Sequence, residues 1–192
     1  MLIGTVMNES SPSAFNPKLE SMTEAELKQR VAETFHDRAD QVIEAIHKTY
    51  PSAKPVEIAG LIQSLRSRST AIEQASRKAA QNAAPAYLYL FAWHTPVLDA
   101  RPRAFHCSEL AFVFDNTDRC AHMTGGGADA RELGGKVSDA WIHFAKTGNP
   151  NHPGLPNWPA FSASNVPTMM LNTKCEVLSD HDREARKMVK QA

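Results

Sequence analysis

The sequence lacks a long hydrophobic run and an excess of charge of either sign. No window reaches the roughly 20 apolar residues that a transmembrane helix needs. Met1 precedes a strand-like segment instead of the basic and apolar parts of a signal peptide. The 21 basic residues equal the 21 acidic residues in number. Because no net positive charge would attract a polyanion, we expect no nucleic acid and no membrane as partners.

Cysteine is scarce, with three residues at Cys107, Cys120 and Cys175. Their odd number and wide spacing favour free thiols in a reducing compartment over a disulfide-stabilised fold. The cytoplasm is therefore the expected location. Cys107, Cys120 and His122 could be combined as zinc ligands, but the sequence has no Cys-x-x-Cys pair and no closely spaced histidine pair to support them. We expect no metal and no cofactor.

Helical periodicity covers much of the chain. Thr23 and Glu26 form a capping-box pattern, and apolar residues recur after it at helical spacing before Pro51, namely Leu27, Val31, Phe35, Val42, Ile43 and Ile46. A second helix is predicted over residues 56–82, where small residues would permit close packing. A third is predicted over residues 131–146, ending at Gly148, which suits a left-handed helix cap.

Two apolar runs, residues 2–7 and 86–93, have the composition of buried strands. Joined by helices, they predict an α/β fold with few parallel strands and several covering helices. Two strands cannot shield both faces and edges of a sheet. We therefore expect most of the sheet to come from another segment, a companion chain or self-association. A start inside a strand also predicts that the true beginning of the protein lies elsewhere.

A carboxylate and an imidazole follow the two predicted strands, as Glu9 and His106. In a hydrolytic triad the acid orients the imidazole, which takes a proton from the nucleophile. Alone, each residue is as well explained as a solvated carboxylate or an ordinary loop histidine. Glu109 is a rival acid, but it is expected to face along the helix that follows His106. Asp99 lies in a loop where a turn or a surface ion pair is the expected role.

A nucleophile is harder to identify. Cys107 adjoins His106, but neighbouring side chains of an extended segment point in opposite directions, so the thiol is not expected to reach the imidazole. Ser10, Ser11 and Ser108 lie in no strand-to-helix elbow that would expose a hydroxyl. Capping or turn roles suffice for these serines.

Several features occur in a fixed order: residues 3–9, residues 86–93, His106, residues 137–150 and residues 155–161. Together they resemble the C-terminal part of the type B carboxylesterases, the family of bacterial nitrobenzyl esterases and cholinesterases. The resemblance implies that residues 1–192 are the C-terminal fragment of a single α/β-hydrolase domain. It also implies that Glu9 and His106 are the acid and histidine of a Ser-Glu-His triad, and that the substrate is a small-molecule ester.

The family also needs a Gly-x-Ser-x-Gly elbow and a glycine-rich oxyanion loop, both before the acid, and neither occurs here. The glycine cluster in residues 124–129 follows His106 and is predicted to be a surface turn. One hypothesis is that the chain supplies the acid and histidine of an esterase whose serine lies on an upstream segment or a companion chain. The alternative is a non-catalytic, helix-rich binding or interaction module derived from an esterase.

Overall fold

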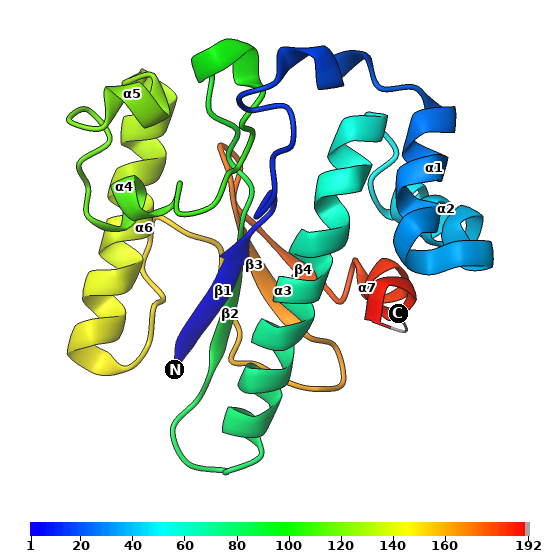
Figure 1. The fold of residues 1–192 in the computed structure, drawn as a ribbon. Helices are drawn as coiled ribbons and strands as arrows, with labels where there is room; N and C mark the ends of the chain where they lie inside the picture. The colour runs from blue at the N-terminus through cyan, green and yellow to red at the C-terminus, as the bar shows by residue number, and fades with distance from the viewer. Residues whose placement is uncertain (191–192) are drawn as a thin grey trace.

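The computed structural model describes residues 1–190, which form a mixed sheet with helices on both faces (Figure 1). The strands lie in the order β1 (Leu2–Val6), β2 (Tyr87–Phe91), β3 (Pro167–Leu171) and β4 (Glu176–Ser179). The first three are parallel, and β4 is antiparallel to β3. The predicted pair of parallel strands is confirmed, with Ile3 opposite Leu88.

The expectation that this chain contributes only two strands is wrong, because β3 and β4 extend the sheet. β3 begins with a proline and contains two methionines, so it lacks most of the β-branched and aromatic residues that mark a strand in a sequence. It is nevertheless buried at every position except the half-buried Met170. β4 is a short edge strand without a buried residue, which removes the usual alternation of apolar and polar side chains.

The first predicted helix is two helices, α1 (Glu24–Phe35) and α2 (Ala39–Thr49). The capping box is present, with the Glu26 backbone nitrogen 3.2 Å from Thr23 Oγ1. α1 ends where His36 adopts a φ of 52°, and the 3-10 turn η2 (His36–Arg38) redirects the chain. The predicted apolar residues of both helices are nevertheless buried in a single cluster.

The long helix α3 (Pro55–Ala79) packs against β1 and against α7 (Arg183–Lys190). It ends three residues before the predicted limit of residue 82. Gly60 allows α3 to approach the loop after β1, since a Cβ at this position would lie 2.4 Å from the backbone oxygen of Ser10. α1, α2, α3 and α7 lie on the same side of the sheet in Figure 1.

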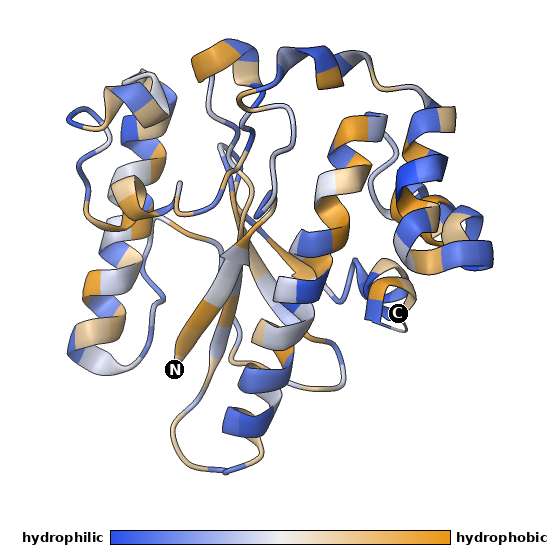
Figure 2. Cartoon of the chain, in the orientation of Figure 1, coloured by the Kyte–Doolittle hydropathy of each residue, from blue (hydrophilic) through white to orange (hydrophobic). Residues whose placement is uncertain are grey.

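The other side of the sheet carries α4 (Leu110–Val113), α5 (Ala121–Thr124) and α6 (Ala128–Thr147), as Figure 1 shows. α6 begins three residues before the predicted start. It ends at Gly148, where a φ of 77° confirms the left-handed cap. Gly125 and Gly126 also have positive φ and make the turn between α5 and α6. Figure 2 shows apolar residues along β1, and polar and apolar residues alternating around α3 and α6.

The outer edge of β1 has no strand partner within residues 1–190. Beside it, Tyr89 lies opposite Gly4 and lines a hollow with Leu110, Phe114 and Ile142. Leu110 is 46% exposed, Phe114 is 71% exposed and Ile142 is 44% exposed. No helix in the part of the chain that the structure describes is long and apolar enough to cross a bilayer.

Candidate active site

Glu9 lies just beyond the carboxyl end of β1, in a segment fixed by backbone hydrogen bonds. The Asn8 nitrogen donates to the Ala104 oxygen at 3.0 Å. The Glu9 nitrogen donates to Ser64 Oγ on α3 at 2.9 Å. The Glu9 carboxylate also accepts a hydrogen bond from the Val6 nitrogen at 3.3 Å. The backbone and carboxylate of Glu9 are therefore tied to β1, to α3 and to the loop that follows β2.

His106 lies in that loop, beyond the 3-10 turn η3 (Val97–Ala100). Phe105 forms a parallel bridge with Asn8, which places His106 beside Glu9. His106 Nδ1 is 2.6 Å from Glu9 Oε2. The Glu9 side chain is 16% exposed and the imidazole is 73% exposed. The structure therefore brings together the two residues selected from the sequence, with the histidine largely open to solvent.

The charge state of His106 depends on this contact. The hydrogen bond that His106 donates to Glu9, followed by the negative charge of Glu9, raises the pKa of His106 above its usual value. With Nδ1 bound to a carboxylate, Nε2 is the nitrogen that can accept a proton. Glu109 has no hydrogen bond to His106, and its Oε2 is buried without a hydrogen-bond partner within residues 1–190. Burial raises the pKa of Glu109. The geometry thus pairs His106 with Glu9.

Cys107, Ser11 and Ser108 make no side-chain hydrogen bond to His106 within the described residues. The segment after His106 is a turn in which Cys107 has a φ of 65°, so the expectation of an extended segment there is wrong. Burial, followed by the charges of nearby carboxylates, raises the pKa of the Cys107 thiol, which disfavours the reactive thiolate. Ser11 Oγ donates to a backbone oxygen 2.6 Å away, and Ser108 is buried.

Asp99 and the possible zinc ligands lie outside the Glu9–His106 contact. Asp99 is an exposed side chain that pairs with Arg101 at 2.7 Å, which confirms the expected ion pair. Cys107, Cys120 and His122 are the residues that could be combined from the sequence as zinc ligands. Within the described range, no group of three or more potential metal-binding side chains gathers at one point.

A hollow of about 390 Å³ opens beside the imidazole. Glu9 and His106 line one part of it, and apolar side chains line much of the rest, including Phe15, Leu98 and Met123. Phe15 is 95% exposed and Leu98 is 47% exposed. Leu98 and the two residues after it all have positive φ, a strained backbone that is more common at functional sites than elsewhere. The arrangement offers a proton acceptor next to an apolar recess.

Sequence reasoning missed three residues that hold the site together: Asn8, Ser64 and Arg103. Asn8 had a signal, because a buried amide at the end of a strand needs partners, and it bonds to both backbone groups of Ala104. Ser64 gave no comparable signal, since its partner Glu9 is 55 residues away in the sequence. Arg103 is likewise buried against distant residues.

The chain also matches known proteins in sequence and in fold. The model of the Carboxylesterase family matches residues 1–189. The chain belongs to the carboxylesterase family. Among curated carboxylesterase relatives, para-nitrobenzyl esterase of Bacillus subtilis (strain 168) is 36% identical over 105 residues, which are 54% of this chain and 21% of that protein. Phenmedipham hydrolase of Pseudarthrobacter oxydans is 27% identical over 186 residues, 94% of this chain and 37% of that protein.

Solved carboxylesterase structures show the same fold. An esterase from Clostridium hathewayi, described as able to hydrolyze aliphatic aromatic polyesters, has a TM-score of 0.77 and 30% identity. That match covers 100% of this chain and 37% of the other. A carboxylesterase of Geobacillus stearothermophilus has a TM-score of 0.73 and 27% identity, and covers 97% and 39%. The chain therefore spans well under half the length of these relatives, and its assignment to the α/β-hydrolase fold is confirmed.

Proposed function

We propose that this chain supplies the acid and the histidine of a carboxylic-ester hydrolase with a Ser-Glu-His triad. The observation that carries the proposal is the 2.6 Å contact between His106 Nδ1 and Glu9 Oε2 in a member of the carboxylesterase family. The serine comes from a segment or companion chain bearing a Gly-x-Ser-x-Gly elbow, because the 192 residues contain no such motif.

The proposed chemistry follows from the nitrogen that Glu9 leaves available. His106 Nε2 takes the proton from the serine hydroxyl as the serine oxygen attacks the ester carbonyl carbon. The imidazolium, stabilised by Glu9, then gives this proton to the leaving alcohol oxygen as the ester bond breaks. In the second half of the reaction, His106 takes a proton from water as the water oxygen attacks the carbonyl carbon of the acyl-enzyme. The imidazolium then gives this proton to the serine oxygen as the bond between the acyl group and the serine breaks, which releases the acid.

The apolar hollow beside His106 supports a small ester with an apolar group as the substrate class. Since His106 protonates the leaving oxygen, the alcohol part of the ester has to lie next to this imidazole. Phe15 and Leu98 are the exposed apolar side chains in reach of that position. The three free cysteines support the cytoplasm as the compartment.

A second candidate function, a non-catalytic interaction module, is favoured by a different observation. The outer edge of β1 is unpaired within residues 1–190, and Tyr89, which lies opposite Gly4 of β1, lines a hollow with the exposed residues Leu110, Phe114 and Ile142. Open strand edges and contiguous apolar patches are typical of surfaces that bind another polypeptide. The same surface also suits the segment that would bring the serine, so the two candidates differ in whether hydrolysis results.

The test is hydrolysis of p-nitrophenyl acetate by the chain alone and by the chain mixed with the serine-bearing N-terminal segment of a carboxylesterase relative. We expect activity only in the mixture. His106→Ala should lower it by a factor on the order of 10⁴, while His47→Ala, a histidine on α2, should leave it unchanged. An inactive mixture whose components bind each other would favour the interaction module. Activity of the chain alone would contradict the assignment of the nucleophile to another segment.

A further inference from the structure

Arg103 is a buried cation three residues before His106, and the triad does not use it. Its side chain is 7% exposed, and its backbone has a positive φ of 57°. Glu20, in the 3-10 turn η1 (Pro17–Ser21), lies 3.0 Å from Arg103 Nη2. Glu57 Oε1 of α3 lies 2.6 Å from Arg103 Nε. Two carboxylates from separate elements therefore hold a single guanidinium.

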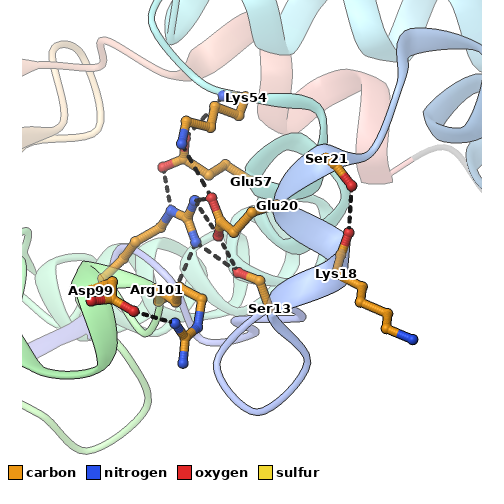
Figure 3. Close-up of polar contacts among 9 residues, drawn as sticks. Ser13, Lys18, Glu20, Ser21, Lys54, Glu57, Asp99 and Arg101 are labelled. Carbon is orange, nitrogen blue, oxygen red and sulfur yellow. Dashed lines mark hydrogen bonds and ion pairs between the residues drawn. The ribbon is translucent and has the colours of Figure 1, made fainter.

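Further contacts complete this group of charges. Arg103 Nη1 donates to Ser13 Oγ at 3.1 Å and to the Arg101 backbone oxygen at 2.7 Å. Lys54 Nζ donates to the other oxygen of Glu20 at 3.2 Å. Figure 3 shows Ser13, Glu20 and Glu57 converging on one guanidinium. We call Arg103 with Ser13, Glu20 and Glu57 the Arg103 cluster; it joins the loop after β1, α3 and the loop after β2.

The Arg103 cluster is connected to His106 by a short run of fixed backbone. Ala104, the next residue, donates to Asn8 Oδ1 at 3.3 Å and accepts from the Asn8 nitrogen. Phe105 is bridged to Asn8, and His106 follows directly. Asn8 itself precedes Glu9. A shift of Arg103 would therefore move the imidazole relative to the carboxylate that orients it.

We propose that Arg103 is a positioning residue, whose ion pairs with Glu20 and Glu57 hold the loop after β2 so that His106 meets Glu9. The guanidinium suits this task because its planar donors bind two carboxylates in fixed directions, which a lysine ammonium cannot do. A positive φ at a non-glycine residue is unfavourable and persists only where its surroundings enforce it, as the Arg103 cluster does. The effect on catalysis rests on the proposed function.

The first readout needs no serine, since it is the imidazole titration of His106 in the 192-residue chain followed by NMR. The charges that raise the pKa of His106 are those of Glu9 and Glu109, so the loss of Arg103 acts through the position of the ring. In Arg103→Gln we expect the pKa of His106 to fall toward its ordinary value. In Arg103→Lys, which keeps the positive charge, we expect the pKa of His106 to fall less than in Arg103→Gln. If Arg103→Gln does not fold, Arg103→Lys and Glu57→Gln provide the same comparison.

Two controls separate positioning from loss of stability. Ile46→Ala removes a buried side chain from the helix cluster and should lower Tm without changing the pKa of His106. Arg77→Gln removes an exposed arginine of α3 and should change neither quantity. An unchanged pKa of His106 in folded Arg103 variants would overturn the proposal, as would an equal pKa change in Ile46→Ala.

The second readout is kinetic and uses the chain mixed with the serine-bearing segment. Arg103→Gln should lower kcat by about 10- to 100-fold, the loss expected when a catalytic group is misplaced by a fraction of an ångström to an ångström. KM should change little, because Arg103 does not line the hollow beside His106. An inactive wild-type mixture would contradict the proposed function and leave the titration as the test of Arg103. Unchanged kcat in an active mixture would overturn the positioning role.

Discussion

At the scale of single residues, the contact between Glu9 and His106 couples the site to pH. Because the pKa of His106 is raised in the folded chain, the contact stabilises the fold fully below the unfolded-state pKa of about 6.5. This stabilisation is lost as the pH rises through the higher folded-state value. The imidazole is largely exposed, so solvent screens the effect on the free energy of unfolding. The titration of His106 is the sensitive measurement.

We expect Glu9→Gln to lower the pKa of His106 toward its ordinary value, because the amide removes both the negative charge and the charged hydrogen-bond acceptor. The measurement is an NMR titration of the ring. Glu109→Gln is the matched control and should produce a smaller decrease, since Glu109 acts on His106 only through its charge. A larger decrease in the control would identify Glu109 as the acid that governs the imidazole.

Glu9 and His106 could be selected from the sequence because each follows an apolar run, and parallel strands bring their carboxyl ends to the same edge of the sheet. Arg103 could not be selected in this way. Its partner Glu20 lies 83 residues away, and the pattern around Arg103 does not show which carboxylates would surround it. Buried ion pairs between distant segments depend on the tertiary fold and leave no local periodicity.

At the scale of secondary-structure elements, α7 is attached to α3 and β3 by buried charges. The side chains of Arg68 and Asp182 form an ion pair and are 3% and 0% exposed. Arg68 Nη2 also donates to Thr168 Oγ1 at 3.0 Å, and Arg186 Nε lies 2.8 Å from Asp182 Oδ1. Burial alone would raise the pKa of Asp182, but the charges of the surrounding arginines and a histidine lower it.

We expect Asp182→Asn to lower the free energy of unfolding by about 3–5 kcal/mol, because it leaves the buried Arg68 without its anion. Because the pKa of Asp182 is lowered in the folded chain, ionised Asp182 stabilises the fold at pH values above its unfolded-state pKa of about 3.9. This stabilisation is lost as the pH falls through the folded-state pKa of Asp182. Urea unfolding should therefore show a smaller difference between the two proteins at strongly acidic pH than at pH 7. Glu184→Gln, an exposed change on α7, should have little effect; an equal loss would contradict the role of burial.

The elements themselves were predictable where the pattern was strong. β1, β2 and the capped start of α1 follow from apolar runs and from the Thr23–Glu26 pair. The break at His36 was not predictable, because the apolar spacing continues through it while the backbone takes a positive φ. β3 was missed since it is buried on both sides and begins with Pro167, so it shows neither alternation nor strand-forming composition.

At the scale of the whole molecule, the side of the fold that carries α4 and α6 combines an open sheet edge with an apolar hollow. The outer edge of β1 has no strand partner within residues 1–190, and the hollow of about 580 Å³ near it is lined by Tyr89, Phe114, Trp141 and Ile142. Most of the other side chains that line this hollow are apolar as well. In water such a surface favours contact with another polypeptide, either the serine-bearing segment, another partner or a second copy of the chain.

We expect the chain alone to self-associate through this surface, and Phe114→Asp to weaken the association by placing a charge where the partner would bury an aromatic ring. Sedimentation velocity over a range of concentrations measures the monomer fraction. Phe15→Asp is the matched control, because Phe15 is equally aromatic and even more exposed but lines the hollow beside His106. Equal weakening by both changes would point to general repulsion between charged chains. A wild-type chain that remains monomeric at every concentration would show that water tolerates the open edge, and the interaction module would then lose its supporting observation.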